Sequence, residues 1–201
     1  MLRSRIPHRR ERPHFSKSAR SGAPGAVGLL REVQGAALLE FAIVLPLLVV
    51  FVVGIFDFSG AFNQKQKIEQ AAQEGAIIAG AQPMSDIASA TAPDSLLPVV
   101  TAVFNSLVGS GVLHGCTLPA AASGTGLAST YTISGCPDSL IITINRGTVV
   151  NSVSPAVVGT NVQVQYPYHW RFNSVIQLLI PGASYAAITQ LSESATVHNQ
   201  M

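Results

Sequence analysis

The chain has 201 residues, which is enough for one modest domain with additional segments. Hydrophobic residues make up 48% of it and charged residues only 11%, whereas soluble domains average about 25% charged residues. The excess of apolar side chains therefore requires a bilayer or a partner surface. The net charge is +2, but eight of the twelve basic residues precede residue 35. This basic arm leads directly into an apolar stretch and has no folded basic partner, so we do not expect it to bind nucleic acid.

Residues 36–56 form an apolar run with one charge, Glu40. As a helix these residues cover about 31 Å, the thickness of a hydrocarbon core. The basic flank places residues 1–35 in the cytoplasm as a leader that we expect to be disordered, and everything after about residue 57 outside. A secretory signal peptide is the alternative, since Ser59-Gly60-Ala61 has small residues suited to cleavage. Its apolar region would exceed the usual length of about 7 to 15 residues, so we predict a single-pass anchor.

The helix is predicted to bend once and then to continue beyond the membrane. Pro46 lies within the span, where it removes a backbone donor and predicts a kink. Residues 57–82 contain no proline, and Pro83 marks the end of this juxtamembrane helix. Small residues recur in it at four-residue spacing, namely Ala71, Gly75 and Ala79, and beside them Ala72, Ala76 and Gly80. Such rows allow close approach of another backbone, which belongs either to another subunit or to the chain's own domain.

Residues 84–201 are predicted to form a small exported α+β domain with an antiparallel sheet. A helix begins near Pro93 and ends at Gly109, and the Ala/Ser/Gly-rich residues 119–129 indicate a flexible loop. Strands are predicted at residues 140–145, 148–153, 162–168 and 184–197, with a short apolar helix at 173–180. Asn145-Arg146-Gly147 indicates a hairpin turn between the first two strands. Pro167 indicates that the third strand is an edge strand or ends early.

Two cysteines, Cys116 and Cys136, both fall in the exported part. In an oxidising compartment a pair at this spacing can close a loop worth roughly 3 kcal/mol, and two unpaired thiols are the alternative. The five histidines are scattered singly, so we predict no metal site and no cofactor. No nucleophile elbow, phosphate loop or paired carboxylates occur, so we assign no catalytic residue and do not expect an enzyme. The aromatic residues Tyr166, Tyr168, Trp170 and Phe172 indicate either core or a binding platform.

Glu40 is the unusual feature of the span, because a charge in a membrane helix costs up to about 3.5 kcal/mol. One explanation is that its side chain reaches the cytoplasmic interface. The other depends on Gly35: if a peptidase cut after this glycine, Ala36 would carry a new amino group and Glu40 would become the fifth residue. The carboxylate would then have a cationic partner in its own or a neighbouring N-terminus, which would set the register between subunits.

The residues from Gly35 to Phe41, Gly-Ala-Ala-Leu-Leu-Glu-Phe, resemble the processing site of type IV pilins and pseudopilins. The longer stretch up to Leu48, together with Ala71-Ala72-Gln73-Glu74-Gly75-Ala76, resembles the TadE-like proteins of tight-adherence (Flp-type) pilus systems. The likeness covers residues 34–82. The chain departs from the family pattern at Ile77 and Ile78, where an arginine and an alanine are usual.

This resemblance implies a minor pilin or pseudopilin-like component in the bacterial inner membrane, acting in pilus assembly or secretion and cell adhesion. Its implied partners are the bilayer, other pilus subunits and a prepilin peptidase that cuts between Gly35 and Ala36. The alternative function is an unprocessed envelope protein whose anchor tethers a ligand-binding domain.

Overall fold

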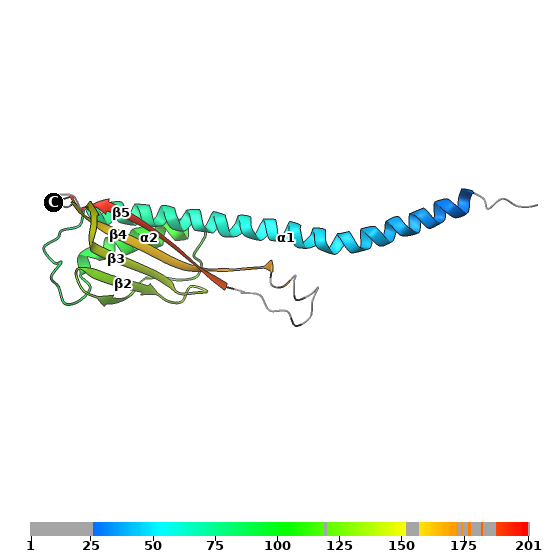
Figure 1. Ribbon diagram of the computed structural model, residues 1–201. Helices are drawn as coiled ribbons and strands as arrows, with labels where there is room; N and C mark the ends of the chain where they lie inside the picture. The colour runs from blue at the N-terminus through cyan, green and yellow to red at the C-terminus, as the bar shows by residue number, and fades with distance from the viewer. Residues whose placement is uncertain are drawn as a thin grey trace, which may run out of the picture. The chain divides into compact units, whose positions relative to one another are not determined.

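The computed structural model describes residues 26–118, 120–151, 157–172, 174, 177, 182 and 188–200. They form the helix α1 (Ala26–Gly80), the short 3-10 helix η1 (Asp94–Leu96), the helix α2 (Leu97–Gly109) and five strands (Figure 1). The strands are β1 (Ala121–Gly124), β2 (Ala128–Ile133), β3 (Leu140–Asn151), β4 (Val157–His169) and β5 (Ile188–His198). The predicted α+β class, a long N-terminal helix followed by a small antiparallel sheet, is confirmed.

Helix α1 begins at Ala26, inside the basic leader, and ends at Gly80, three residues before Pro83. It continues through Pro46, and the bend predicted there stays a prediction. The chain divides between Leu45 and Pro46 into an N-terminal unit and a larger unit that contains the remaining elements. One part of α1 is long and apolar enough to cross a membrane, and none of its most apolar window is buried by the described residues. Large side chains of the apolar run are exposed, Ile43 at 71% and Phe56 at 75%, as lipid contact would require.

The five strands form an antiparallel sheet in sequential order, β1-β2-β3-β4-β5. Inward-facing positions of neighbouring strands pair directly, as Tyr131 with Ile142 and Ile142 with Val164. These residues alternate with more exposed ones along β2, β3 and β4, which leaves one face of the sheet apolar. Strands β4 and β5 run alongside the C-terminal part of α1 (Figure 1).

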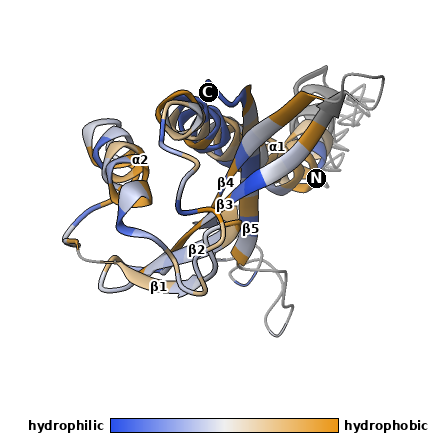
Figure 2. Cartoon of the chain, turned by 90° about the vertical axis from the view of Figure 1, so that its left-hand side faces the viewer, coloured by the Kyte–Doolittle hydropathy of each residue, from blue (hydrophilic) through white to orange (hydrophobic). Residues whose placement is uncertain are grey.

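The core lies between this apolar face and the two helices, which lie side by side over the sheet (Figure 2). Helix α2 ends at Gly109, as predicted, but it begins at Leu97 and not near Pro93, because Asp94–Leu96 form the 3-10 turn η1. It turns one face inward because its apolar residues recur every three or four positions. The fully buried side chains come from all these elements and include Ile68, Val99, Val103, Leu107, Tyr131, Ile133, Ile142, Ile144, Val162 and Val164.

Three local predictions about the sheet are wrong. The predicted loop at 119–129 contains β1 and the start of β2, because cross-strand pairing with β2 overrides the weak strand propensity of alanine, serine and glycine. Residues 145–147 form no hairpin turn: β3 passes through them with a register shift. Arg146 is fully buried there, and its amide donates to the Leu127 carbonyl. Strand β4 is internal, and Pro167 is tolerated because pairing with β3 has ended at Gln165.

The last strand was expected at 184–197, and β5 covers Ile188–His198. Residues 183–187 and most of the apolar helix predicted at 173–180 lie outside the described residues.

Candidate functional site

Gly35 and Glu40, the predicted processing and registration residues, lie within helix α1 and are exposed, as is Ala36. A Cβ placed on Gly35 would meet nothing within 4 Å, so packing does not require a glycine at this position. Among the described residues no partner forms a hydrogen bond or ion pair with Glu40. An unpaired carboxylate on an otherwise apolar surface is costly in a bilayer, so Glu40 needs either the interface or a cation from outside the described chain.

The helical state of Gly35 bears on cleavage, because a peptidase acts on extended backbone. Glycine in a helix interior is less stable than alanine by about 1 kcal/mol, so the helix unwinds most easily where glycine stands. A glycine that no neighbour requires and that weakens its helix is consistent with a cleavage position.

The six small residues of the helical rows are all buried within the larger unit. Ala71, Ala72, Ala76 and Ala79 belong to its core cluster. A Cβ on Gly75 would lie 2.5 Å from Cγ2 of Val103 in α2 and 3.3 Å from Cγ1 of Val162 in β4. A Cβ on Gly80 would lie 2.9 Å from the His198 carbonyl oxygen. The rows thus face the chain's own domain, which is one of the two arrangements that the sequence leaves open.

Cys116 and Cys136 form a disulfide, as predicted, with Cα atoms 4.5 Å apart. The bond joins the segment that follows α2 to the connection between β2 and β3. It therefore links the end of α2 covalently to the sheet, in addition to the core that the two share.

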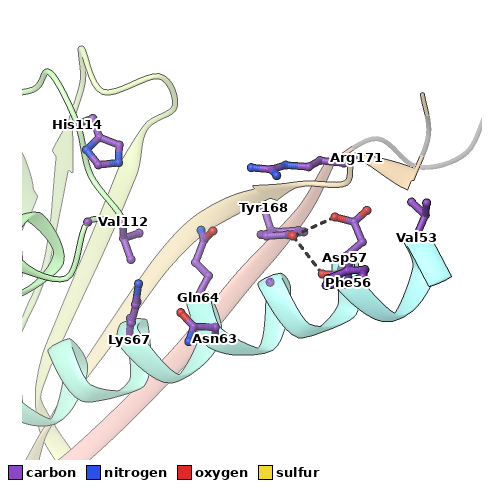
Figure 3. Close-up of a pocket in the computed structure, with 12 residues that line it drawn as sticks. Val53, Phe56, Asp57, Asn63, Gln64, Lys67, Val112, His114, Tyr168 and Arg171 are labelled. Atoms are coloured by element: carbon purple, nitrogen blue, oxygen red, sulfur yellow. Dashed lines mark hydrogen bonds between the residues drawn. The ribbon is translucent and has the colours of Figure 1, made fainter. Parts of the chain in front are cut away.

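A buried carboxylate, Asp57, joins α1 to the sheet where the predicted span ends. It is only 5% exposed. The Tyr168 hydroxyl lies 3.1 Å from both the Asp57 carbonyl oxygen and Oδ1, to either of which it donates, and the Phe172 amide donates to Oδ2 at 2.7 Å (Figure 3). Gly60 provides the room, because a Cβ there would lie 2.6 Å from the Tyr168 hydroxyl oxygen. We call Asp57, Tyr168 and Phe172 the junction.

The junction has a clear electrostatic signature. Burial raises the pKa of Tyr168 above its ordinary value, and the hydrogen bond to Asp57 and its negative charge raise this pKa further. All of these effects favour the neutral phenol, which can donate to the carboxylate. The phenol is therefore present as a donor at neutral pH and is lost only in alkali.

A groove of about 450 Å³ opens beside the junction, between α1, the segment after α2 and the end of β4. Figure 3 shows Asn63, Gln64 and Lys67 rising from α1 on one side and Arg171 lying beyond Tyr168 on the other. His114 lines the remaining wall. Both carboxylate oxygens of Asp57 accept hydrogen bonds within the chain, so the groove offers mainly donors and cations to a ligand.

Of the four aromatic residues at the end of β4 and just after it, one is confirmed as core, and a binding role for the others stays a prediction. Tyr166 is buried in the core, whereas Tyr168 and Trp170 lie at the junction end of the domain. The Trp170 ring packs edge-on against Phe58 and Tyr168, with ring centroids 5.2 and 5.1 Å apart, and its indole N–H donates to Thr189 Oγ1. In the described part of the chain no three metal-binding side chains cluster.

Sequence reasoning identified neither Asp57 nor Arg146 as a site residue. Arg146 donates to Asp86 Oδ1 at 2.6 Å and to the carbonyl oxygens of Pro83 and Gly126, so it holds the segment that follows α1 against the sheet. The signal for Asp57 was present, since it is the first charge after the span, but its partner Tyr168 lies 111 residues away.

Comparison with known protein families gives one match. A family model described as TadE-like protein matches residues 35–76, which confirms the resemblance expected from the sequence. No curated protein and no solved structure matches the chain.

Proposed function

We propose, from the TadE-like segment at residues 35–76, that this protein is a membrane-anchored minor pilin or pseudopilin-like component of a tight-adherence pilus assembly or secretion machinery. The observation that carries the proposal is where the match begins and ends. It starts at Gly35, includes Glu40 and the span, and ends at Ala76 in the buried helical rows. The family likeness thus covers the predicted processing site, the anchor and the segment that fastens the anchor to the domain.

The proposed topology places the N-terminus in the cytoplasm and the sheet domain outside the bacterial inner membrane. The basic leader supports this orientation through the positive-inside rule. The Cys116–Cys136 disulfide supports it as well, since such bonds persist in oxidising compartments. The role is structural, and the partners are the bilayer and other pilus subunits.

Processing is the first test. We expect a prepilin peptidase to cut between Gly35 and Ala36 and to leave residues 36–201 as the mature chain. Gly35→Leu should block this cut, because leucine both adds a side chain and strengthens the helix at the cleavage position. Gly109→Leu is the matched control, since a Cβ at Gly109 also meets nothing within 4 Å and it lies far along the chain. Mass spectrometry of the membrane-extracted protein gives the answer, and a native protein that retains residues 1–35 beside an active peptidase would reject processing.

Glu40 is the second test, because we assign it to subunit register and not to insertion. Glu40→Ala should leave cleavage and membrane insertion intact and reduce the co-isolation of other pilus components. Glu74→Ala is the control, as Glu74 is an exposed glutamate of the same helix outside the span. Unchanged co-isolation for both variants would mean that Glu40 only reaches the membrane interface.

One observation favours the alternative, an unprocessed envelope protein that presents a ligand-binding domain. The groove beside the junction is lined by Lys67, His114 and Arg171 and could hold an anionic ligand. The fate of the leader distinguishes the two functions. The alternative requires residues 1–35 to remain on the chain, and the pilus component requires their removal.

A further inference from the structure

The apolar surface of the anchor continues onto the domain. Val50, Phe51, Gly54 and Ile55 of the span form an open, almost wholly apolar groove together with Phe58 and with Phe172, which follows β4. A Cβ on Gly54 would lie 4.0 Å from Cε2 of Phe172. Gly54 precedes Asp57 by one turn of the helix, or about 5 Å. One part of the domain therefore lies level with the last turn of the membrane helix.

The side chains around this level are those that proteins place at a membrane surface. Phe58 is 68% exposed and Ile188, the first residue of β5, is 54% exposed. Trp170 joins them, with its ring against Phe58 and its N–H satisfied by Thr189. Arg171 is exposed next to it. Tryptophan rings with satisfied polar atoms, flanked by a cation, are typical of the headgroup region of a bilayer.

The junction makes this placement rigid. Asp57 would be costly at the end of the span, but its oxygens accept from the Tyr168 hydroxyl and the Phe172 amide. The same bonds hold the end of β4 to the helix at a fixed level. The domain thus cannot swing away from the membrane without exposing a buried carboxylate.

We propose that this end of the domain, formed by Phe58, Trp170, Arg171, Phe172 and Ile188, sits in the headgroup layer, and that its partner is the lipid of the outer leaflet. The proposal rests on the membrane anchoring in the proposed function. It adds that the domain contacts the bilayer surface directly and is not held away from it by a solvent-exposed stretch of helix. Continuity with the span selects lipid over a second protein, because four of the residues that line the groove belong to the helix that the proposed function places in the bilayer.

Trp170 is the single tryptophan of the chain and reports on this surface directly. The full-length protein is placed in phosphatidylcholine nanodiscs with a tryptophan-free scaffold, where both faces are open to solvent. We expect lipids brominated near the carbonyl ends of their acyl chains to quench Trp170 strongly. Aqueous iodide should quench it several-fold less than it quenches a control tryptophan.

The control is Val149→Trp combined with Trp170→Phe. Val149 is 57% exposed on β3 and pairs with Val158, whose carbonyl accepts from Asn199 near the Gly80 end of α1. That end is roughly 35 Å from Asp57 along the helix. Iodide should quench the control tryptophan, and brominated lipid should not. Ile188→Trp with Trp170→Phe gives a second reporter on the proposed surface, since Ile188 pairs with His169, and it should behave as Trp170 does.

Two outcomes would overturn the proposal while leaving the anchor intact. One is a protein that stays in the disc but whose Trp170 is quenched by iodide and not by lipid. The other is a Trp170 that becomes shielded only as the number of proteins per disc rises, which would assign the surface to a second copy. Failure of the protein to remain in the disc would reject the anchoring itself, and with it the proposed function.

Discussion

Two stretches of one helix have opposite surroundings. Residues 38–56 of α1 carry large apolar side chains that the described chain leaves exposed, as Ile43 at 71% shows, whereas residues 57–80 bury one face against the domain, as Ile68 at 0% shows, and expose Phe58, Phe62 and Ile77 on the others. The first stretch is rich in leucine, valine and phenylalanine, and the second has small residues on its inner face. Large side chains suit a fluid lipid environment, and small ones admit a fixed neighbour at close range. Within this helix, the small residues and not apolar composition as such mark the face that packs against the domain.

The largest effect should come from filling the close contact in the buried stretch. Gly75→Leu places a side chain where even a Cβ would lie 2.5 Å from Val103. We expect a loss of at least about 3 kcal/mol in the free energy of unfolding, because α2 must move away from α1. Thermal unfolding of the full-length protein in detergent measures it.

Two leucine substitutions serve as controls for this comparison. Gln73→Leu lies on the exposed side of the same stretch, and Ala42→Leu lies in the exposed span. Both should unfold at the temperature of the unmodified protein. Equal destabilisation by all three variants would contradict the distinction between the stretches.

Arg146 sharpens the comparison at the far end of the buried stretch. Its fully buried guanidinium pairs with Asp86 and with the Pro83 carbonyl just after α1. Arg146→Met keeps much of the volume but leaves these acceptors without their donor, so we expect a loss of about 3 kcal/mol in chemical denaturation. A loss below about 1 kcal/mol would mean that water replaces the guanidinium.

The same pair should make stability depend on acid. The hydrogen bond from Ser95, together with Arg146, holds the pKa of Asp86 below its ordinary value, although burial opposes this. A lowered carboxyl pKa contributes stability that is complete above about pH 4 and lost as the pH falls through the folded-state pKa. Asp86→Asn should weaken this acid dependence, and Asp94→Asn, at the start of η1, is the control.

Membrane insertion of the span should depend on the charge of its side chains, and its substitutions should not disturb packing in the domain. Leu47→Lys puts an ammonium group on an exposed apolar side chain near the middle of residues 36–56. We expect the apparent free energy of insertion to worsen by about 3 kcal/mol, measured with a translocon insertion assay. The folded domain should unfold at an unchanged temperature. A lower unfolding temperature instead would show that Leu47 packs against protein.

Sequence patterns predicted the elements that depend on local chemistry. The apolar run of α1, the inward face of α2 and the cysteine pair each have a signal within a short stretch or a single pairing. Arg146 shows why other elements could not be predicted from the sequence. Asn-Arg-Gly has the composition of a turn, and contacts with distant residues, among them Asp86, which lies 60 residues earlier, place Arg146 in a buried strand segment. The sequence did not predict β1 for the same reason: its residues have weak strand propensity, and its pairing with β2 makes it a strand.

The site was predicted in part. Gly35 and Glu40 belong to a local motif that the family match covers, and their roles in processing and subunit register stay predictions. The junction does not, because Asp57 and Phe172 meet through a contact that spans 115 residues. A charge at the end of an apolar run shows where a membrane helix ends, but not what binds that charge.

Tyr168 tests how firmly β4 is fastened to α1 at the boundary between the two stretches. Tyr168→Phe removes the hydroxyl that donates to Asp57 and should cost about 1.5 kcal/mol of unfolding free energy. Because the pKa of Tyr168 is raised, its contribution is complete below about pH 10 and is lost as the pH rises through the folded-state pKa. The variant should therefore differ most from the unmodified protein at neutral pH and least in strong alkali. A difference that stays constant up to alkaline pH would contradict the role of the phenol as donor.

The smallest effect should come from the ion pair between Lys65 and Glu193, which joins α1 to β5 at 3.2 Å. The Lys65 side chain is 48% exposed, so water screens the attraction and ordering the long side chain costs entropy. Lys65→Ala should lower the unfolding free energy by no more than about 0.5 kcal/mol, and added salt should abolish even that. Gln66→Ala, at an exposed neighbouring position, is the control. A loss greater than about 1 kcal/mol would mean that charge helps to fasten the helix, whereas the expected result assigns this role to the packed glycine and alanines and to the junction.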